Sequence, residues 1–527
     1  MATSQETSLI TASRLEPVLG SSWVFTWRQA AVCAFMVSAF LCFSYIPLSY
    51  HSTWVHVAQG QALLEHGLFY SLDATQPLAS SVPYYETSWL SNLTLYGLSL
   101  TYQGEPLSWA VSICLMLTCL MLARMAWNLS KRYTVVVFSV AAFLGLVWFQ
   151  LGIASPAMFG ILFFVGLIWL LQSFAKQDNL TIWQYVAVLS LMIVWVNFDA
   201  SVIFGVLYLI SLALGEIIDS LVETRGSFNK TFNRKSVRSR VWLAELAVLA
   251  TLCSPLGLSF WHLAVSSGNT SLWASFGGYR PVLLGSILGG SFAISLATYA
   301  TLIRLSSAKI SATEIISVLV FAVLLVFNQA LILWFAPVVL LPIIGHWVAI
   351  LGVGTPEEKA PELKPGEEPQ PLRFAYTLVC ALLLWIGFAL SPISIPVLGG
   401  KPREFTKIYA PSTPHVAANY LQANPTYQLV FAPADWSDWL SFAGPQGTQM
   451  FATSRFHLLP KQAQFDYDIL SRGARRWEEV ADRYGIQTIM IDKSRQRGML
   501  ASAKDASDNW SVALEDDSIL VLKRRAS

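Results

Sequence analysis

Hydrophobic residues form long unbroken runs over the first three quarters of the chain and short alternating runs over the last quarter. A run of about 17 or more apolar residues is long enough to cross a bilayer as a helix. The runs that meet this length lie near 29–49, 107–126, 134–152, 157–173, 182–198, 200–221, 241–262, 284–304, 313–329, 331–350 and 374–395. The pattern therefore predicts a polytopic α-helical membrane protein with about eleven spans.

The last quarter of the chain has the pattern of a small soluble domain. Residues 401–527 hold 30 of the 66 charged side chains of the whole chain. Short apolar runs there alternate between helical and strand spacing, which is typical of an α/β sandwich. We expect helices at 415–424, 436–444, 475–485 and 497–505, strands at 428–433, 448–453 and 487–492, and a closing hairpin that turns at Asp516–Asp517. The domain is assigned to 396–527.

Lys and Arg residues in short loops predict the orientation, because they favour the cytoplasmic side of a membrane. The strongest basic cluster lies at 225–240. Placing it in the cytoplasm also places there the tail 1–28 and the Pro/Glu-rich linker 354–373, which precedes the last span of the transmembrane region 29–395. The loop 50–106 and the C-terminal domain then face outward.

Composition narrows the classes of function. Only 13% of the residues are charged and the formal net charge is +2, whereas a soluble protein carries roughly 25% charged residues. This excludes a cytosolic enzyme, a disordered scaffold and a nucleic-acid binder held by a basic surface. All six cysteines lie in apolar runs, so neither a disulfide framework nor a CxxC metal motif is present.

Ionisable residues gather at the outward ends of the predicted spans. Besides His51, which has an interfacial position, they are His56, Asp73, Glu86, Asp199, His262 and Arg280. Each also has an ordinary structural interpretation: a turn for Asp73, a solvated loop for Glu86, a helix N-cap for Asp199, and interfacial or flanking positions for the other three. If the protein has a site, the sequence places it on the outer face.

The outward loop 50–106 carries the most specific pattern. Its first part has helical spacing and predicts an amphipathic helix on the membrane surface that ends at Gly67. The loop reads W-x-H-x3-G-x6-G-x5-D and then W-L-S, which corresponds to Trp54, His56, Gly60, Gly67, Asp73, Trp89, Leu90 and Ser91. This spacing resembles the first outer loop of bacterial GT-C-type integral membrane glycosyltransferases. Segments 194–205, 253–261 and 335–342 and the C-terminal domain resemble later parts of the same family, in the same order.

The resemblance implies a reaction and a set of partners. It implies a GT-C-like fold that transfers a sugar from a polyprenyl-phosphate donor, embedded in membrane lipid, on the outer face of a bacterial inner membrane. The acids Asp73, Glu86 and Asp199 are the catalytic candidates, and His56, His262 and Arg280 are candidate contacts for the donor phosphate. A divalent metal is compatible with this chemistry, although the sequence assigns no metal ligands. Nucleic acid is not an expected partner.

Several positions depart from the family pattern. Ser52, Ser88 and Ser155 stand where the family has Asp, Glu and Arg, and Asp199 stands where it has His. Arg455 matches the Arg of the family's D-G-R strand end, with Thr453 and Ser454 before it. A serine cannot act as a base near neutral pH. The sequence therefore leaves open a second hypothesis, a catalytically inactive GT-C-fold relative that serves as a subunit or assembly protein in a membrane complex.

A transporter is a third and weaker hypothesis, because charged residues within the predicted spans are nearly absent.

Overall fold

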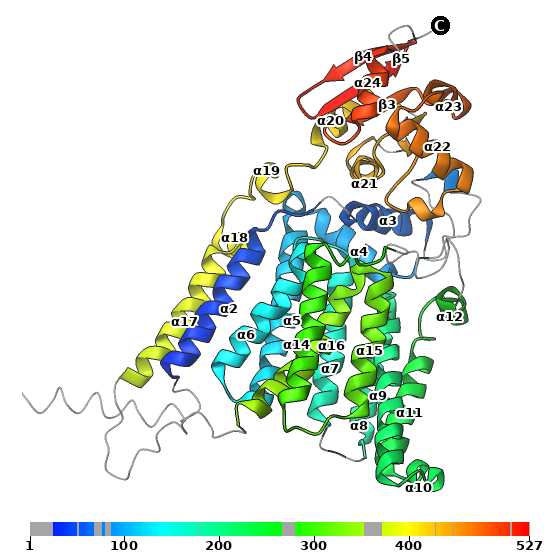
Figure 1. The fold of residues 1–527 in the computed structure, drawn as a ribbon. Coiled ribbons are helices and arrows are strands. Elements are labelled where there is room, and N and C mark those ends of the chain that lie inside the picture. Colours follow the sequence, from blue (N-terminus) through cyan, green and yellow to red (C-terminus); the bar gives the residue numbers. More distant parts are fainter. Residues whose placement is uncertain are drawn as a thin grey trace, which may run out of the picture.

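Long helices form where the sequence has its apolar runs. The computed structural model describes residues 25–49, 52–67, 76–79, 86–175, 177, 179–265, 280–352, 372–426, 428–445, 447–505 and 509–525. The eleven runs correspond to α2 (Trp27–Tyr45), α5 (Glu105–Ser130), α6 (Tyr133–Val147), α7 (Pro156–Ser173), α8 (Ile182–Phe198), α9 (Val202–Glu223), α11 (Lys235–Ala250), α14 (Ile287–Leu305), α15 (Ala312–Phe327), α16 (Ile332–Ile350) and α17 (Leu372–Leu390). The protein is thus a multi-pass membrane protein with an α-helical bundle (Figure 1).

The number of helices that satisfy the length of a membrane span is smaller than the predicted eleven. Seven helices in the described ranges are long and apolar enough, and an eighth is a pair, Ala375–Leu390 and Pro392–Leu398, bent by 77°. Two of the remaining helices, α8 and α15, are apolar but only 17 and 16 residues long. The third, α11, begins with a basic stretch, KSVRSR. The apolar runs locate the helices correctly but do not give each one a full span.

Smaller helices cap the bundle or lie at its ends. They are α3 (Thr53–His66), α4 (Trp89–Ser99), α10 (Phe228–Phe232), α12 (Leu258–Val265), α18 (Ile395–Leu398) and α19 (Phe405–Ile408). The central helix of the bundle is α16, because 78% of its most apolar stretch is buried. Residues of α16 form one continuous core with residues of α5, α6, α7 and α9.

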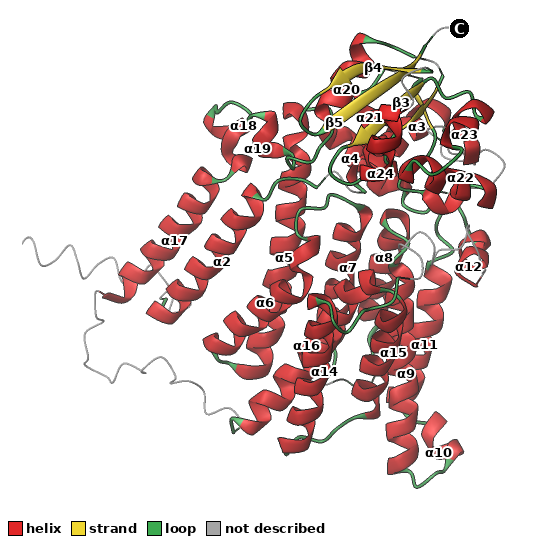
Figure 2. Ribbon diagram, turned by 45° about the horizontal axis from the view of Figure 1, so that its top comes forward, coloured by secondary structure: helices red, strands yellow, loops and turns green. Residues whose placement is uncertain are grey.

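The chain ends in a compact α/β domain above one end of the bundle (Figure 2). Its elements are α20 (His415–Ala423), β1 (Leu429–Phe431), α21 (Ala434–Ala443), β2 (Gln449–Met450), α22 (Lys461–Arg472), α23 (Trp477–Arg483), β3 (Thr488–Asp492), α24 (Arg497–Asp505), β4 (Trp510–Glu515) and β5 (Ile519–Arg524). Every predicted helix and strand of this domain is present. Only α22 lacked a prediction, because it is largely polar and buries little more than Ala463, Asp466 and Leu470.

The five strands form one mixed sheet in the order β2-β1-β3-β5-β4. Strand β1 runs parallel to β2 and β3, whereas β5 is antiparallel to β3 and β4. Every residue of β3 is buried, as expected for a central strand that is covered on both faces. Strand β2 lies at one edge of the sheet, and the loop that follows it contacts residues of the first part of the chain.

Contacts of three kinds fasten the domain to the bundle. The Leu48 N donates to the Ile408 carbonyl at the end of α19 at 2.8 Å, and the Leu48 carbonyl accepts from the Ala410 N at 2.9 Å. The Arg403 Nε donates to Glu105 Oε1 at 2.5 Å at the start of α5, where Glu105 is fully buried. The ring of Trp54 on α3 packs edge-on against Trp439 of α21, with 4.4 Å between centroids.

The prediction of a surface helix after residue 50 is correct for the helix and wrong for its location. The helix α3 ends at Gly67, which has φ 88°, as predicted. It packs between α4 and α21, however, and buries both Trp54 and the polar Gln59. The helix is therefore enclosed between the bundle and the domain, because its polar face has partners in the domain that the local sequence does not reveal.

A close helix contact stabilises the bundle at the end far from the domain. A Cβ atom at Gly215 of α9 would lie 2.2 Å from the Thr313 Cα of α15. One turn further along α9, the Asp219 carboxylate accepts hydrogen bonds from the Ala312 N at 2.9 and 3.0 Å, which caps the start of α15. The glycine permits the approach and the aspartate fixes it.

We therefore expect Gly215→Ala to destabilise the protein by about 1–3 kcal/mol, the usual range for overpacking a tight contact. The matched control is Gly145→Ala on α6, where a Cβ would meet nothing within 4 Å. Thermal unfolding in detergent, followed by tryptophan fluorescence, should show a lower Tm for the first variant only. An equal Tm for both would contradict the proposed contact.

Candidate functional site

A buried arginine of the C-terminal domain joins the two halves of the molecule. Arg455, in the loop after β2, donates from Nη2 to Glu86 Oε2 at 3.0 Å and from Nη1 to Gln59 Oε1 at 2.9 Å. Glu86 lies just before α4, and Gln59 lies on α3. All three side chains are buried. The domain thus places a permanent cation next to an acid of the first loop.

A second buried acid near this junction is Asp199, in the turn between α8 and α9. The Ser201 hydroxyl donates to its Oδ2. On the opposite side lies α7, where a Cβ atom at Gly160 would come within 2.3 Å of the same oxygen. Burial, with a smaller contribution from the charge of Glu86, raises the pKa of Asp199 to about 6, although hydrogen bonds from Ser201 and Ala200 act against the shift. The two carboxylates therefore interact electrostatically.

Contacts of α4 bring these two acids together. The Trp89 Nε1 donates to Asn197 Oδ1 at 3.0 Å, and the Ser91 hydroxyl donates to the Phe198 carbonyl at the end of α8. Both contacts hold the start of α4 against the turn that carries Asp199. The tryptophan and the serine of the W-L-S segment thus have a structural role, which is to fix the loop of Glu86 beside Asp199.

His56 extends the cluster along α3. Its Nδ1 lies 2.9 Å from Asn92 Oδ1 of α4. The close approach of the two helices depends on Gly60, since a Cβ there would lie 2.2 Å from the Asn92 carbonyl oxygen. Burial and the charge of Arg455 lower the pKa of His56 to about 4. The imidazole is therefore neutral at neutral pH, and because its Nδ1 donates to the Asn92 oxygen, its Nε2 can accept one further hydrogen bond.

Sequence reasoning missed a further acid, Asp438 of α21. Only 1% of its surface is exposed. Its Oδ1 accepts a hydrogen bond from the Ser454 N at 3.0 Å, and its Oδ2 has no hydrogen-bond partner among the described residues. Burial raises its pKa to about 7. The signal in the sequence was that this acid lies between Trp436 and Trp439 in a short predicted helix, where the two tryptophans indicate the buried face.

Not every predicted site residue joins this cluster. Asp73 lies outside the described residues. His262 on α12 and Arg280 before α14 are exposed. Arg280 uses its backbone carbonyl to accept a hydrogen bond from the Gln329 N at 2.8 Å. Within the described ranges, neither side chain has a hydrogen bond or ion pair with the cluster.

The described residues offer two carboxylates for a metal rather than a complete ligand set. In the ranges that the structure describes, no three His, Cys, Asp or Glu side chains are grouped as metal ligands. Glu86 also faces Arg455, whose positive charge competes with a metal ion. We therefore derive no step through a metal.

Comparison with known proteins gives a fold but no sequence relative. No family model matches the chain, and no curated protein matches it in sequence. The oligosaccharyltransferase of Archaeoglobus fulgidus, tethered to an acceptor peptide with the NVT sequon, is similar with a TM-score of 0.53 and 11% identity over 95% of this chain and 74% of that one. The archaeal oligosaccharyltransferase AglB from the same organism, in complex with an inhibitory peptide and a dolichol-phosphate, is similar with a TM-score of 0.50 and 11% identity. The match covers 88% of this chain and 69% of that one.

A third structure, ArnT from Cupriavidus metallidurans bound to undecaprenyl phosphate, gives a TM-score of 0.48 and 12% identity over 93% of this chain and 98% of that one. At 11% identity, the first two likenesses establish the fold and leave the activity open. The resemblance to GT-C-type glycosyltransferases is confirmed at that level: the chain has a GT-C-like fold.

Proposed function

We propose that this protein is an integral membrane glycosyltransferase that takes a sugar from a polyprenyl-phosphate donor on the outer face of a bacterial inner membrane. The observation that carries the proposal is the position of Asp199 at the junction between the bundle and the C-terminal domain, where burial and the charge of Glu86, itself paired with Arg455, raise the pKa of Asp199. A GT-C-like fold supports the same reaction class, since the structures it resembles include oligosaccharyltransferases. The basic cluster at 225–240 supports the outward orientation of this junction.

In this proposal Asp199 is the general base. The acceptor hydroxyl or amine attacks the anomeric carbon of the sugar while its proton passes to the Asp199 carboxylate. The bond between that carbon and the phosphate oxygen breaks, and the polyprenyl phosphate leaves with the electron pair. A pKa of about 6 suits this role, because the carboxylate is ionised at neutral pH and still basic enough to accept a proton.

Glu86 and Arg455 have different roles in the same scheme. Their ion pair holds the loop before α4 in place. The negative charge of Glu86 also raises the pKa of Asp199, so Glu86 tunes the base. Asp73 remains a candidate acid on the sequence pattern alone, and His56, His262 and Arg280 remain candidate contacts for the donor phosphate.

A second candidate function is supported by the same ion pair. Glu86 and Arg455 are buried, and they contact each other and, from Arg455, Gln59, so the pair already joins the C-terminal domain to the first loop. This arrangement equally suits an inactive GT-C-fold relative that uses the junction to hold its domain and acts as a subunit of a membrane complex. Binding of undecaprenyl phosphate separates the candidates: a transferase should retain it in native mass spectrometry, whereas a scaffold should not retain it and should copurify with a stable partner.

Removing the base should abolish transfer without unfolding the protein. We expect Asp199→Asn to lower transfer by about 10²- to 10⁴-fold, the usual contribution of general base catalysis. Transfer is measured as free undecaprenyl phosphate released from a panel of undecaprenyl-phosphate-linked sugars in membranes that contain the protein. Asp468→Asn, an exposed residue paired with Arg472, is the matched control and should retain full activity. Unchanged transfer in Asp199→Asn would refute the assigned base.

The pH dependence of transfer follows from the same group. Only the ionised Asp199 accepts a proton, so transfer should rise with pH through about 6 and stay level above it. Glu86, on the loop before α4, should influence this midpoint. Since its charge raises the pKa of Asp199, Glu86→Gln should shift the midpoint to lower pH. A profile that is flat between pH 5 and 8 in the wild type would contradict the proposed mechanism.

A further inference from the structure

A cavity of about 360 Å³ is lined by residues of α5, α7, α9, α15 and α16. These helices extend away from the C-terminal domain (Figure 1). Its position follows from α7: Gly160 touches Asp199, whereas Gln172, twelve residues further along the same helix, lines the cavity. At 1.5 Å per residue, this is a separation of about 18 Å. The cavity is therefore separate from the candidate glycosyltransferase site, and its volume is within the range of ligand pockets.

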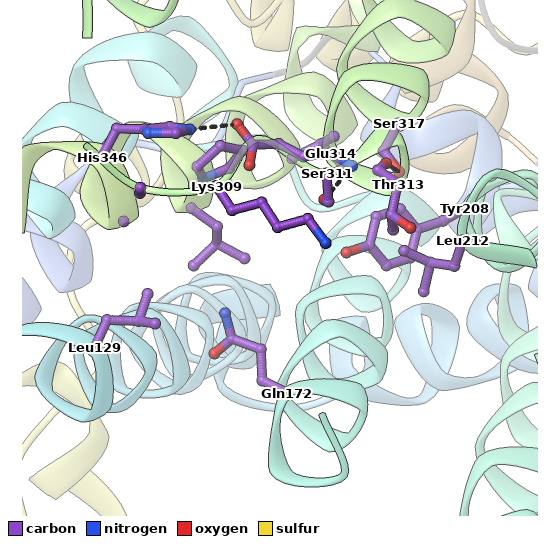
Figure 3. A pocket seen from close by; sticks show the side chains of 15 residues that line it. Leu129, Gln172, Tyr208, Leu212, Lys309, Ser311, Thr313, Glu314, Ser317 and His346 are labelled. Carbon is purple, nitrogen blue, oxygen red and sulfur yellow. Dashed lines mark hydrogen bonds and ion pairs between the residues drawn. The ribbon is translucent and has the colours of Figure 1, made fainter. Parts of the chain in front are cut away.

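An acid and a histidine meet on one wall of this cavity (Figure 3). The His346 Nε2 of α16 lies 2.9 Å from the Glu314 Oε1 of α15. Only 3% of His346 is exposed, and its Nδ1 has no hydrogen-bond partner among the described residues. An ionisable side chain buried among membrane helices is costly, and such residues usually mark a functional site. This pair is therefore the first reason to regard the cavity as a binding site.

The charges around the cavity favour a cationic ligand. Lys309, at the mouth, donates to Glu223 Oε1 at 2.9 Å, and the same carboxylate accepts from Arg234 at 2.5 Å. Lys309 thus has its own counter-ion outside the cavity. Glu314, in contrast, has no Lys or Arg partner among the described residues. The only ion-pair partner of Glu314 among the described residues is thus His346. An ammonium group in the cavity would place a permanent positive charge beside the carboxylate, with hydroxyl groups of the lining such as Tyr208 and Thr313 as further acceptors.

One part of the lining is apolar and belongs to membrane helices, while Gln172, Ser311 and Ser317 add polar groups. The apolar side chains include Leu129 of α5, Leu212 of α9 and Val338 and Leu341 of α16. Apolar walls beside a single acid suit a molecule that has both a cationic head and a hydrocarbon chain. A ligand of this kind is abundant in a bilayer and would enter from it.

We propose that this cavity binds an amine-bearing phospholipid, with its ammonium group at Glu314 and the start of an acyl chain along Leu129, Leu212 and Leu341. The phosphate of the head group then lies near the mouth, where Lys309 can exchange Glu223 for it. Such an exchange costs little, because Lys309 and Glu223 form an exposed ion pair. The site is independent of the proposed glycosyl transfer.

The first test uses the full-length protein and two lipids of opposite head-group character. Purified protein is exchanged into phosphatidylethanolamine or phosphatidylglycerol, and bound lipid is counted by native mass spectrometry. We expect the wild type to retain the ethanolamine lipid at least tenfold better. Glu314→Gln, which can still accept the His346 hydrogen bond, should lose this preference, and Glu216→Gln on α9, outside the cavity lining, should keep it.

The second test fills the cavity instead of changing its charge. A Cβ atom at Gly345 would meet nothing within 4 Å, although this residue lines the cavity. Gly345→Leu should therefore fold normally and should lose retained phosphatidylethanolamine at least tenfold. Soluble glycerophosphoethanolamine, which lacks the chains, should not compete at equal concentration.

Three outcomes would overturn the proposal. The first is equal retention of the two lipids by the wild type. The second is unchanged retention of phosphatidylethanolamine by both Glu314→Gln and Gly345→Leu. The third is full competition by glycerophosphoethanolamine, which would assign the cavity to a free amine rather than to a lipid.

Discussion

The buried ion pair between Arg455 and Glu86 is the interaction on which the arrangement of the outer loop depends. An arginine stays charged at every relevant pH, so burying it requires a partner. Removing one partner of a buried pair typically costs about 3–5 kcal/mol. Two residues earlier in the same loop, the Thr453 hydroxyl donates to Gln76 Oε1 at 2.6 Å. One loop of the C-terminal domain thus fixes the connection between α3 and α4 at two points.

This constraint gives the two central carboxylates different environments. Glu86 faces a permanent cation, whereas Asp199 is stabilised by the Ser201 hydroxyl and by backbone N–H groups. Neutral donors offset the cost of burial less completely than a full positive charge does. Burial consequently raises the pKa of Asp199 to about 6 despite these donors. Pairs of acids whose surroundings separate their roles are a recurring basis of acid–base chemistry in enzymes.

Much of the fold could be predicted from the sequence, and the contacts of the site could be predicted only in part. Apolar runs locate the eleven long helices, and short alternating runs locate the strands of the domain, because both depend on local periodicity. Glu86 and Asp199 stood out because ionisable residues are scarce near membrane helices. The pairing of Glu86 with Arg455 crosses 369 positions of the chain, and no local pattern encodes such a contact. The enclosure of α3 was missed for the same reason.

The geometry around Ser88 bears on the departures from the GT-C family pattern. The family has a glutamate at this position, and this chain has a serine. The Glu86 Oε1 accepts a hydrogen bond from the Ser88 N at 2.8 Å, so the acid two residues earlier folds back over the vacated position. Its other oxygen meets Arg455. The loop therefore has a carboxylate at the start of α4, two residues before the position at which the family pattern has its glutamate.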